Sequence, residues 1–447
     1  MTYSDAIQFL YSLRWFGAKF GLTNSLKLAE LAGSPQHQLR FIHVAGTNGK
    51  GSTCAMLESV YRAAGLRVGL FTSPHLVSFA ERIQVNRRLI SEADIVRLTT
   101  RLQSLLQQFA TEDHPTFFEV VTVMALRYFV DQGCDLVIWE TGLGGRLDAT
   151  NIVTPLVSII TNIQFDHQKY LGETLASIAG EKAGIIKPAI PVVTGTAEPE
   201  ALAVIQSVAH EKSASLMVVP AAEINQPPLD NLALPLLGDH QKMNAAVALA
   251  AVRTLADQLP ISNEIMRAGL GGFQWPGRLQ LVSLPAGRKL LLDGAHNIGG
   301  AQTLAAAITK YFPREEPTLI LGILRDKDWP AMCQVLAPLA RRILLVPVHS
   351  ERTAEPHGLA EVCQRANPTA QVSEFSSLDA AWPAAAGDSF ITIAGSLYLV
   401  GEAMELLQLL PRTNGLERRL NEWSAPEDMP TPVAAPSGGT GRIKSEV

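Results

Sequence analysis

Cysteine is scarce in this chain and is not spaced for a metal site or a disulfide framework. Only four of the 447 residues are cysteines, and no two of them form a C-x-x-C pair. They are Cys54, Cys134, Cys333 and Cys363. Zinc sites and small disulfide-stabilised folds depend on such paired spacings. The pattern therefore argues against both classes, and we expect a protein of the reducing cytoplasm.

Long apolar runs and a strong excess of one charge are also missing. Charged residues make up 18% of the chain and the net charge is −5. No apolar run approaches the roughly 18 residues that cross a bilayer, and the start, MTYSDAIQFLYSLRW, lacks the basic and apolar stretches of a leader. We therefore expect no membrane span and no export. Nucleic acid is not expected as the main partner, and small molecules are favoured.

Short apolar runs alternate with helical patterns through the first 190 residues. Predicted strands cover residues 41–45, 68–71, 136–140 and 156–161, and predicted helices cover 52–64, 91–110, 117–132 and 175–186. Strands that alternate with helices in this way are typical of a parallel sheet with helices on both faces. The fold class is therefore α/β.

The alternation begins again after residue 273. The segment GGFQWPGR at 271–278 is predicted to be a loop, and strands are predicted at 289–293, 318–322, 342–346, 371–375 and 389–394. We predict a first domain at 1–272, a linker at 273–287 and a smaller Rossmann-like α/β domain at 288–412. Residues 413–447 are polar and rich in proline, which is typical of a disordered tail.

A glycine-rich loop, HVAGTNGKGST at 43–53, follows the first predicted strand and precedes a helix. This is the setting of a phosphate-binding loop, although the pattern G-x-x-x-x-G-K-[ST] is not matched, because Gly46 is too close to Lys50 and Gly51 precedes Ser52. Backbone N–H groups and the helix N-terminus can hold phosphate, Lys50 can neutralise it, and Ser52 can reach Mg²⁺. A glycine turn without a ligand is the weaker alternative, since it needs no lysine. The first domain is thus a P-loop domain.

Polar side chains follow three further predicted strands. Ser73 follows 68–71, Glu140 ends 136–140, and His167 follows 156–161. Carboxyl ends of parallel strands form the usual ligand edge of a sheet, so these residues are candidate Mg²⁺ ligands. The alternatives are a helix cap for Ser73, an ion pair with Arg146 for Glu140, and a structural role for His167. Lys182, in helix 175–186, is by itself most simply a solvated residue.

Seven motifs together closely resemble the folylpolyglutamate synthase and dihydrofolate synthase family of the Mur ligase superfamily. They are GTNGKGS, TSPHL, ETGLGGRLDATN, FDHQKYLG, EKAGIIK, WPGR and DGAHN, and the resemblance covers about residues 15–400. The family's own phosphate loop has the same short form, which accounts for the departure noted above. The first domain is then an ATPase domain and the second a glutamate-ligase domain.

The resemblance also implies roles for individual residues. ATP binding is implied for Gly46, Thr47, Asn48, Gly49, Lys50, Gly51, Ser52, Asn244, Arg278, Asp293 and His296. Two Mg²⁺ ions are implied at Ser52, Ser73, Glu140 and His167, and Lys182 matches a lysine carried as its N6-carboxylated (carbamate) form. Pterin contacts are implied for Ala18, Lys19, Phe20, Thr116, Phe117, Phe118, Glu119, Leu147, Asp148 and Ala149. Catalytic roles are implied for Lys50, His167, Lys182 and Arg278.

The implied enzyme is a cytoplasmic, monomeric, ATP-dependent ligase of folate metabolism. It joins L-glutamate to dihydropteroate or to the γ-carboxylate of reduced folates through an acyl phosphate. A folylpolyglutamate synthase without the first activity is one alternative. A cell-wall Mur ligase is disfavoured, because only 45 residues precede Gly46 and a UDP-sugar-binding domain needs more. A nucleotide-binding switch protein is disfavoured because it would not need the metal set.

Overall fold

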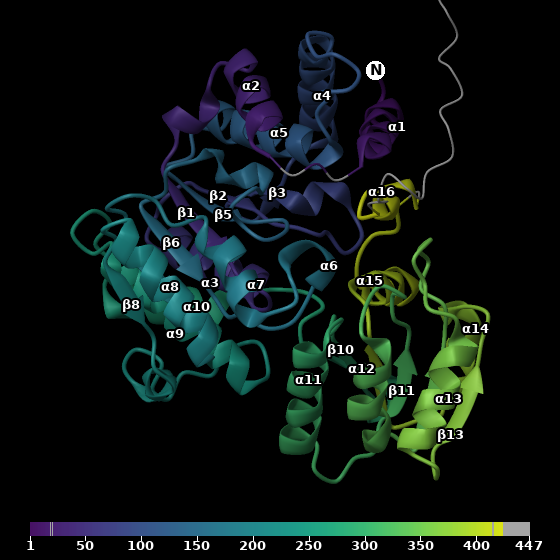
Figure 1. Ribbon diagram of the computed structural model, residues 1–447. Coiled ribbons are helices and arrows are strands. Elements are labelled where there is room, and N and C mark those ends of the chain that lie inside the picture. Colours follow the sequence, from purple (N-terminus) through teal and green to yellow (C-terminus); the bar gives the residue numbers. More distant parts are fainter. Residues whose placement is uncertain (18, 20, 414, 423–447) are drawn as a thin grey trace, which may run out of the picture.

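The computed structural model describes residues 1–17, 19, 21–413 and 415–422, which form two α/β domains (Figure 1). The first contains an eight-stranded sheet in the order β4-β3-β2-β5-β1-β6-β7-β8. The strands are β1 (Phe41–Ala45), β2 (Val68–Phe71), β3 (Ile83–Val85), β4 (Arg88–Leu89), β5 (Leu136–Glu140), β6 (Val157–Ile160), β7 (Val192–Thr194) and β8 (Leu216–Val218). The predicted parallel sheet is confirmed for β2, β5, β1, β6, β7 and β8, whereas β3 and β4 add an antiparallel edge.

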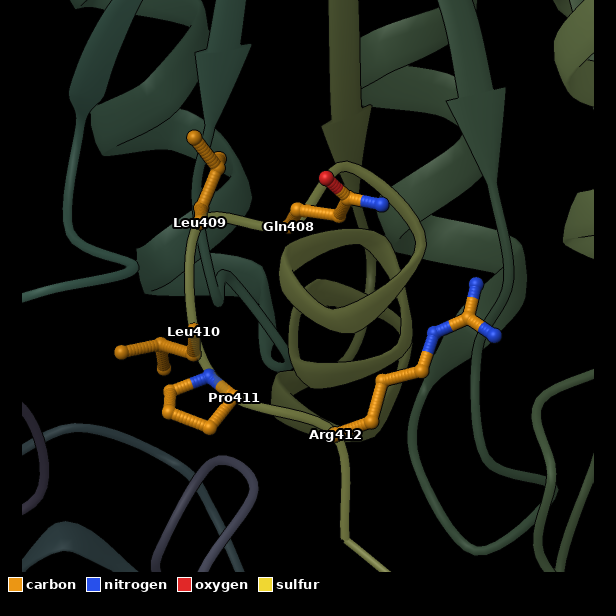
Figure 2. A pocket seen from close by; sticks show the side chains of 5 residues that line it. All are labelled: Gln408, Leu409, Leu410, Pro411 and Arg412. Atoms are coloured by element: carbon orange, nitrogen blue, oxygen red, sulfur yellow. The ribbon is translucent and has the colours of Figure 1, made fainter.

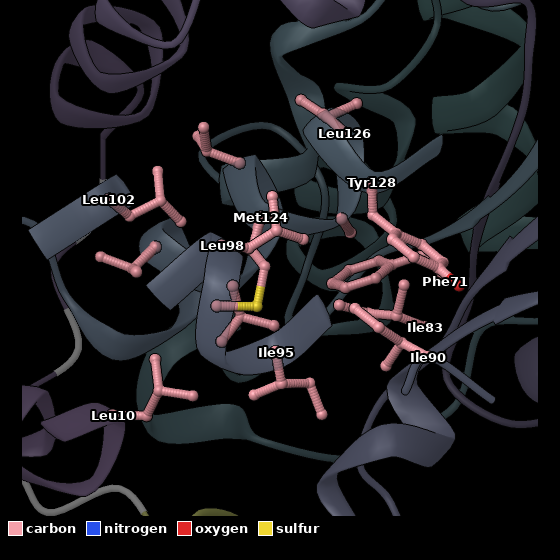
Figure 3. Close-up of a cluster of buried hydrophobic side chains, with 14 of the residues drawn as sticks. Leu10, Phe71, Ile83, Ile90, Ile95, Leu98, Leu102, Met124, Leu126 and Tyr128 are labelled. Carbon is pink, nitrogen blue, oxygen red and sulfur yellow. The ribbon is translucent and has the colours of Figure 1, made fainter. Parts of the chain in front are cut away.

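Helices cover both faces of this sheet. Successive side chains of a strand point to opposite sides, so the apolar strands present apolar side chains on both faces, and each face is buried by helices. Phe41 and Trp139 pack into one core with helices α1, α4 and α5, and Figure 3 shows part of this core. Ile42 and Ile138 pack into the other with α3, α9 and α10. The helices are α1 (Tyr3–Ser12), α2 (Thr23–Leu31), α3 (Lys50–Ala63), α4 (Glu92–Leu106), α5 (Phe117–Asp131), α6 (Gln168–Leu171), α7 (Leu175–Ala183), α8 (Pro199–Glu211), α9 (Asp239–Thr254) and α10 (Asn263–Gly272).

The second domain has a six-stranded sheet in the order β13-β12-β11-β14-β10-β9. Its strands are β9 (Gln280–Ser283), β10 (Lys289–Leu292), β11 (Thr318–Leu321), β12 (Arg342–Leu345), β13 (Gln371–Glu374) and β14 (Phe390–Ala394). Its helices are α11 (Ile298–Tyr311), α12 (Trp329–Leu336), α13 (Pro356–Ala366), α14 (Leu378–Ala385) and α15 (Leu397–Leu406). Separate apolar clusters fill the two faces of this sheet. After α15 the chain returns to the first domain, where α16 (Leu416–Arg419) packs against α1. Among the described residues, no helix is long and apolar enough to cross a membrane.

Two predicted segments differ in the structure. Residues 273–287, predicted as a linker, contain β9, which pairs antiparallel with β10 and so belongs to the second sheet. The predicted disordered tail from residue 413 is wrong for residues 415–422, since they contain α16 and bury Leu420 in the core of the first domain. Residues 423–447 lie outside the described residues.

Candidate active site between the two domains

A cavity of about 550 Å³ lies between the domains and is lined by both of them. It contains the glycine-rich loop, the residues that follow β2, β5 and β6, Arg278 just before β9, and the turn that follows β10. Every site residue predicted from the sequence lines it except Ala18 and Phe20, which lie outside the described residues. A second pocket is lined by five consecutive residues after α15, Gln408–Arg412, and brings no other element to them (Figure 2).

The glycine-rich loop is held closely against its neighbours. Gly49 has φ +85° and leads into α3, and a Cβ on it would collide with the side-chain oxygen of Asn244. A Cβ on Gly46 would collide with the Thr161 hydroxyl, which donates to the Asn48 carbonyl at 2.7 Å. Glycine is therefore required at both positions. The Lys50 ammonium donates to the carbonyl oxygens of Gly46, at 3.1 Å, and of the following threonine, so its charge lies within the loop.

Glu140 ends β5 as a buried carboxylate on the cavity wall. Its Oε2 accepts a 2.9 Å hydrogen bond from the backbone N–H of Ser73. Burial raises the pKa of Glu140 to about 7, although the nearby Lys50 charge opposes this. The alternative ion pair with Arg146 does not form, because Arg146 Nη2 lies 2.7 Å from Glu181 Oε1 instead. Glu140 is thus a buried carboxylate that a cation would stabilise.

The residues around Glu140 suit a hard cation better than a transition metal. Ser52, at the start of α3, is buried and lines the same cavity. In the described part of the chain, no group of three or more His, Cys, Asp or Glu side chains is placed to hold a metal. An ion here would use hydroxyl groups, a carboxylate, water and phosphate, which is the ligand set that Mg²⁺ accepts.

Lys182 on α7 is buried, not solvated. Its Nζ donates to the carbonyl oxygen of Gly46 at 2.9 Å, beneath the glycine-rich loop. Burial and the Lys50 charge lower the pKa of Lys182 to about 7. The interpretation of Lys182 as a solvated helix residue is therefore wrong. A buried lysine with this pKa is partly a neutral amine near pH 7, which is the form that reacts with carbon dioxide.

A polar cluster after β6 joins the first domain to the second. Lys327 Nζ lies 2.6 Å from Asp166 Oδ1, and Asn297 Nδ2 donates to Asp166 Oδ2 at 2.9 Å. Burial alone would raise the pKa of Asp166, but Lys327, His167 and His296 lower it well below its usual range. Asp166 is therefore ionised and acts as the anion that holds these residues together.

His167 belongs to the same cluster and faces a cation. Its Nε2 lies 3.4 Å from Lys327 Nζ. Burial and Lys327 lower the pKa of His167 to about 3, and burial and Lys327 likewise lower that of His296 to about 4. Both imidazoles are therefore neutral at pH 7. A metal ion at His167 would require this ring or the lysine to move.

Arg278 reaches the cavity from the connection between the domains. The residue is partly buried, and its Nη1 atom is buried without a hydrogen-bond partner among the described residues. Burial lowers the pKa of Arg278 despite the opposing charge of Asp293. Asp293 accepts backbone hydrogen bonds from Leu279 at 2.7 Å and Ala295 at 2.9 Å, which fixes both turns. A buried guanidinium that lacks an acceptor is suited to an incoming anion.

The polar residues among the predicted pterin contacts make hydrogen bonds within the protein itself. Glu119 caps the start of α5 by accepting a 2.7 Å hydrogen bond from the Thr116 N–H. Asp148 is buried and accepts hydrogen bonds from the N–H groups of Leu143, at 2.8 Å, and Thr150, at 3.0 Å. Both carboxylates therefore shape the loops of the cavity wall. Lys19 donates to the carbonyl oxygens of residues 112 and 114 and thus ties the first loop to this wall.

Several residues that line the cavity were not predicted from the sequence. Asp166, Lys327, Arg14, Arg82, Arg352 and residues 420–422 all line it. One signal could have identified Lys327, because it lies in the segment that follows a predicted strand of the second domain, as His167 does in the first. The arginines carry no such local signal.

Comparison with known proteins agrees with this architecture. The Mur ligase middle domain matches residues 44–191, and the Mur ligase glutamate ligase domain matches residues 277–397. The chain is 34% identical over 429 residues to the dihydrofolate synthase/folylpolyglutamate synthase of Bacillus subtilis, covering 91% of this chain and 99% of that protein.

Solved structures give the same result. Folylpolyglutamate synthase from Thermotoga maritima matches with a TM-score of 0.80 and 32% identity, over 93% of this chain and 99% of that one. Escherichia coli FolC in complex with DHPP and ADP matches with a TM-score of 0.79 and 31% identity, over 92% and 98%. The chain therefore belongs to the Mur ligase family and, within it, to the dihydrofolate synthase/folylpolyglutamate synthase group.

Proposed function

We propose that this protein is an ATP-dependent ligase that joins L-glutamate to dihydropteroate and to the γ-carboxylate of reduced folates through an acyl phosphate. One observation carries the proposal: the glycine-rich loop of the first domain and Arg278 at the entrance to the second line one cavity. The B. subtilis relative is named for both activities, and the E. coli neighbour holds DHPP and ADP. Both support this choice of substrates.

ATP is proposed to bind between the domains. Its phosphates would lie on residues 46–52, where glycine backbone N–H groups and the start of α3 favour negative charge. Asn244, Arg278, Asp293 and His296 would complete the site. The Lys50 ammonium now binds loop carbonyls at 3.1 and 3.3 Å, and phosphate oxygens would offer it a stronger partner.

Mg²⁺ is proposed at the carboxylate edge of the same cavity. The Glu140 carboxylate and the hydroxyl groups of Ser52 and Ser73 fit it, and His167 is the fourth candidate. When bound, Mg²⁺ would neutralise phosphate charge. Lys182 is proposed to carry a carbamate: its neutral amine attacks carbon dioxide, a C–N bond forms and one proton is released. The side chain of Lys182, a cation when protonated, would then be an anion beneath the glycine-rich loop.

The proposed reaction has two steps. A carboxylate oxygen of the folyl substrate attacks the γ-phosphorus of ATP, the bond to the bridging oxygen breaks, and ADP leaves. The neutral amine of L-glutamate then attacks the acyl carbon, phosphate leaves with the carboxylate oxygen, and the amine loses a proton. Lys50 and Arg278 would screen the repulsion between the two anions. Contact between the domains would keep water from the acyl phosphate.

A monomer in the reducing cytoplasm is the proposed working form. All four cysteines are free thiols, which supports the reducing compartment.

Phosphate release with omitted substrates tests the proposed function. Purified protein is incubated with Mg²⁺, ATP, L-glutamate and either dihydropteroate or a reduced folate monoglutamate, and each component is left out in turn. We expect phosphate only in the complete mixtures, with a product one glutamate heavier by mass spectrometry. Product from the folate alone would identify a folylpolyglutamate synthase without the first activity. Phosphate release that needs no acceptor would contradict the proposal.

A further inference from the structure

The segment 415–422, which we name the C-terminal strap, leaves the second domain and docks on the first. In Figure 1, its helix α16 lies between α1 and α15. Arg418 Nη2 lies 3.1 Å from Glu405 Oε2, which holds the strap to α15. Glu417 Oε2 accepts hydrogen bonds from the Ser78 hydroxyl at 2.9 Å and the Phe79 N–H at 2.8 Å, and both donors belong to the first domain. The strap therefore spans the two domains.

The end of the strap enters the cavity and occupies three of its arginines. Arg14 Nε donates to the Glu422 carbonyl oxygen at 2.6 Å, and Arg82 Nη2 donates to Asn421 Oδ1 at 2.6 Å. Arg352 Nε, from the second domain, lies 3.1 Å from Glu422 Oε2. All five residues line the cavity, as does Leu420. The strap thus places a glutamyl carboxylate and two neutral acceptors on a cationic surface inside the candidate active site.

This surface has the chemistry of a carboxylate-binding site. Arg14 and Arg82 are buried, with exposed fractions of 7% and 3%, and Arg352 donates to the Tyr398 hydroxyl at 3.0 Å and also pairs with Asp326 at 3.2 Å. Buried arginines need acceptors, and carboxylates are their strongest partners. Two of the three arginines here have only neutral acceptors from the strap. A ligand with several carboxylates would satisfy them better.

The bonding of the strap is also incomplete. Glu422 Oε1 is buried and has no hydrogen-bond partner among the described residues. An unsatisfied buried carboxylate oxygen lowers the stability of the docked state. The strap also follows residue 397, where the match to the glutamate ligase domain ends. It contributes no strand to either sheet.

We propose that the C-terminal strap is an internal competitor of the carboxylate-bearing substrate. In the docked state it holds Arg14, Arg82 and Arg352 and fills the end of the cavity that they line. The folyl substrate, with its glutamyl carboxylates, binds these arginines only after the strap has left. The identity of the competing ligand rests on the proposed function, whereas the docking itself does not.

Three chain lengths test this proposal: the full chain, residues 1–422 and residues 1–413. The 1–422 chain is the matched control, because it keeps the strap and loses only residues 423–447. If the strap is docked nine-tenths of the time, its removal lowers the KM for the reduced folate by about tenfold. We expect this decrease in 1–413 relative to 1–422, with the KM for ATP unchanged. The synthetic peptide GLERRLNE, residues 415–422, should inhibit 1–413 competitively against the folate.

An unchanged or raised KM for the folate would overturn the proposal. If 1–413 retains the circular dichroism spectrum of 1–422 but has an equal or higher KM for the folate, the strap is a wall of the site and the proposal is wrong. Should 1–413 fail to fold, the full chain with Glu417→Gln and Asn421→Ala replaces it. Those substitutions weaken docking without shortening the chain, and the same decrease in KM is expected.

A binding measurement separates this proposal from the proposed function. If none of the chains makes a glutamylated product, the proposed function fails, but fluorescently labelled GLERRLNE can still be titrated into 1–413 and 1–422. Saturable binding to 1–413, and at least tenfold weaker binding to 1–422, would support the strap as an occupant. Equal binding to both, or binding to neither, would overturn it.

Discussion

Lys327 Nζ lies 2.6 Å from Asp166 Oδ1, and this ion pair connects the two domains inside the cavity. The exposed fractions of the two side chains are 8% and 7%, so water screens the pair little. Asp166 follows β6 and Lys327 follows β11, which places each at the carboxyl end of a strand. The pair therefore fixes the relative position of the two strand edges that line the site.

Substitution of Lys327 should loosen the arrangement of the domains. In Lys327→Met the Asp166 carboxylate stays buried without its main cation, which typically costs about 3 kcal/mol. We expect kcat/KM to fall about a hundredfold and small-angle scattering to show a more extended protein. The control is Lys289→Met, because Lys289 pairs with Glu315 at 2.5 Å within the second domain and does not connect the two domains. Equal scattering and equal kcat/KM for the two variants would contradict this role.

Arg278→Ala should reduce turnover far more than stability. The buried guanidinium has an Nη1 without an acceptor, so its removal costs the folded protein few contacts. Loss of a donor aimed at transition-state charge typically costs about a hundredfold or more in kcat. Arg341, exposed before β12, provides the control Arg341→Ala. Steady-state kinetics and urea unfolding measure the two effects, and an unchanged kcat would remove Arg278 from the mechanism.

Lys182 should make activity depend on both pH and bicarbonate. With its pKa near 7, the neutral amine becomes more abundant between pH 6 and 8, and only this form takes up carbon dioxide. We expect enzyme stripped of carbon dioxide at pH 6 to recover activity with bicarbonate, and to do so faster at pH 8. A carbamate signal in ¹³C NMR should accompany recovery. Lys182→Met should abolish both responses, whereas Lys212→Met, at a lysine whose side chain is 39% exposed, should not.

The lowered pKa of Lys182 also makes the free energy of unfolding depend on pH. The folded-state pKa of Lys182, about 7, lies below its ordinary value of 10.5. Below pH 7 both states hold the proton, so the contribution of Lys182 to the free energy of unfolding does not change. Between about pH 7 and 10.5 the unfolded state binds more protons, so this contribution becomes more favourable to the folded state as pH rises. A wild-type curve parallel to that of Lys182→Met across this range would contradict the shift.

The central strands and the glycine-rich loop could be predicted because their signals are local. The strand over 41–45 is an apolar run, and the loop follows it directly. Strands β3, β4, β7 and β8 were not among the predicted strands, and each has only two or three residues. Such short strands form through pairing with a neighbour, and their own residues give little indication of it.

The contacts between the domains could not be predicted in the same way. Asp166 and Lys327 are 161 residues apart, and only the relative placement of two sheets brings them together. Lys182 was first interpreted as solvated because a helical pattern does not reveal what covers that face; the resemblance to a family corrected it. The strap was missed because its polar composition outweighed its two apolar anchors, Leu416 and Leu420.

The fate of one oxygen atom tests whether the reaction passes through an acyl phosphate. A reduced folate monoglutamate labelled with ¹⁸O in its γ-carboxylate is converted with ATP and L-glutamate, and the released phosphate is analysed by mass spectrometry. An acyl phosphate formed in this cavity transfers one carboxylate oxygen to each phosphate, so we predict one ¹⁸O per phosphate for each amide bond formed. Amide product accompanied by unlabelled phosphate would show that the amide bond forms without an acyl phosphate.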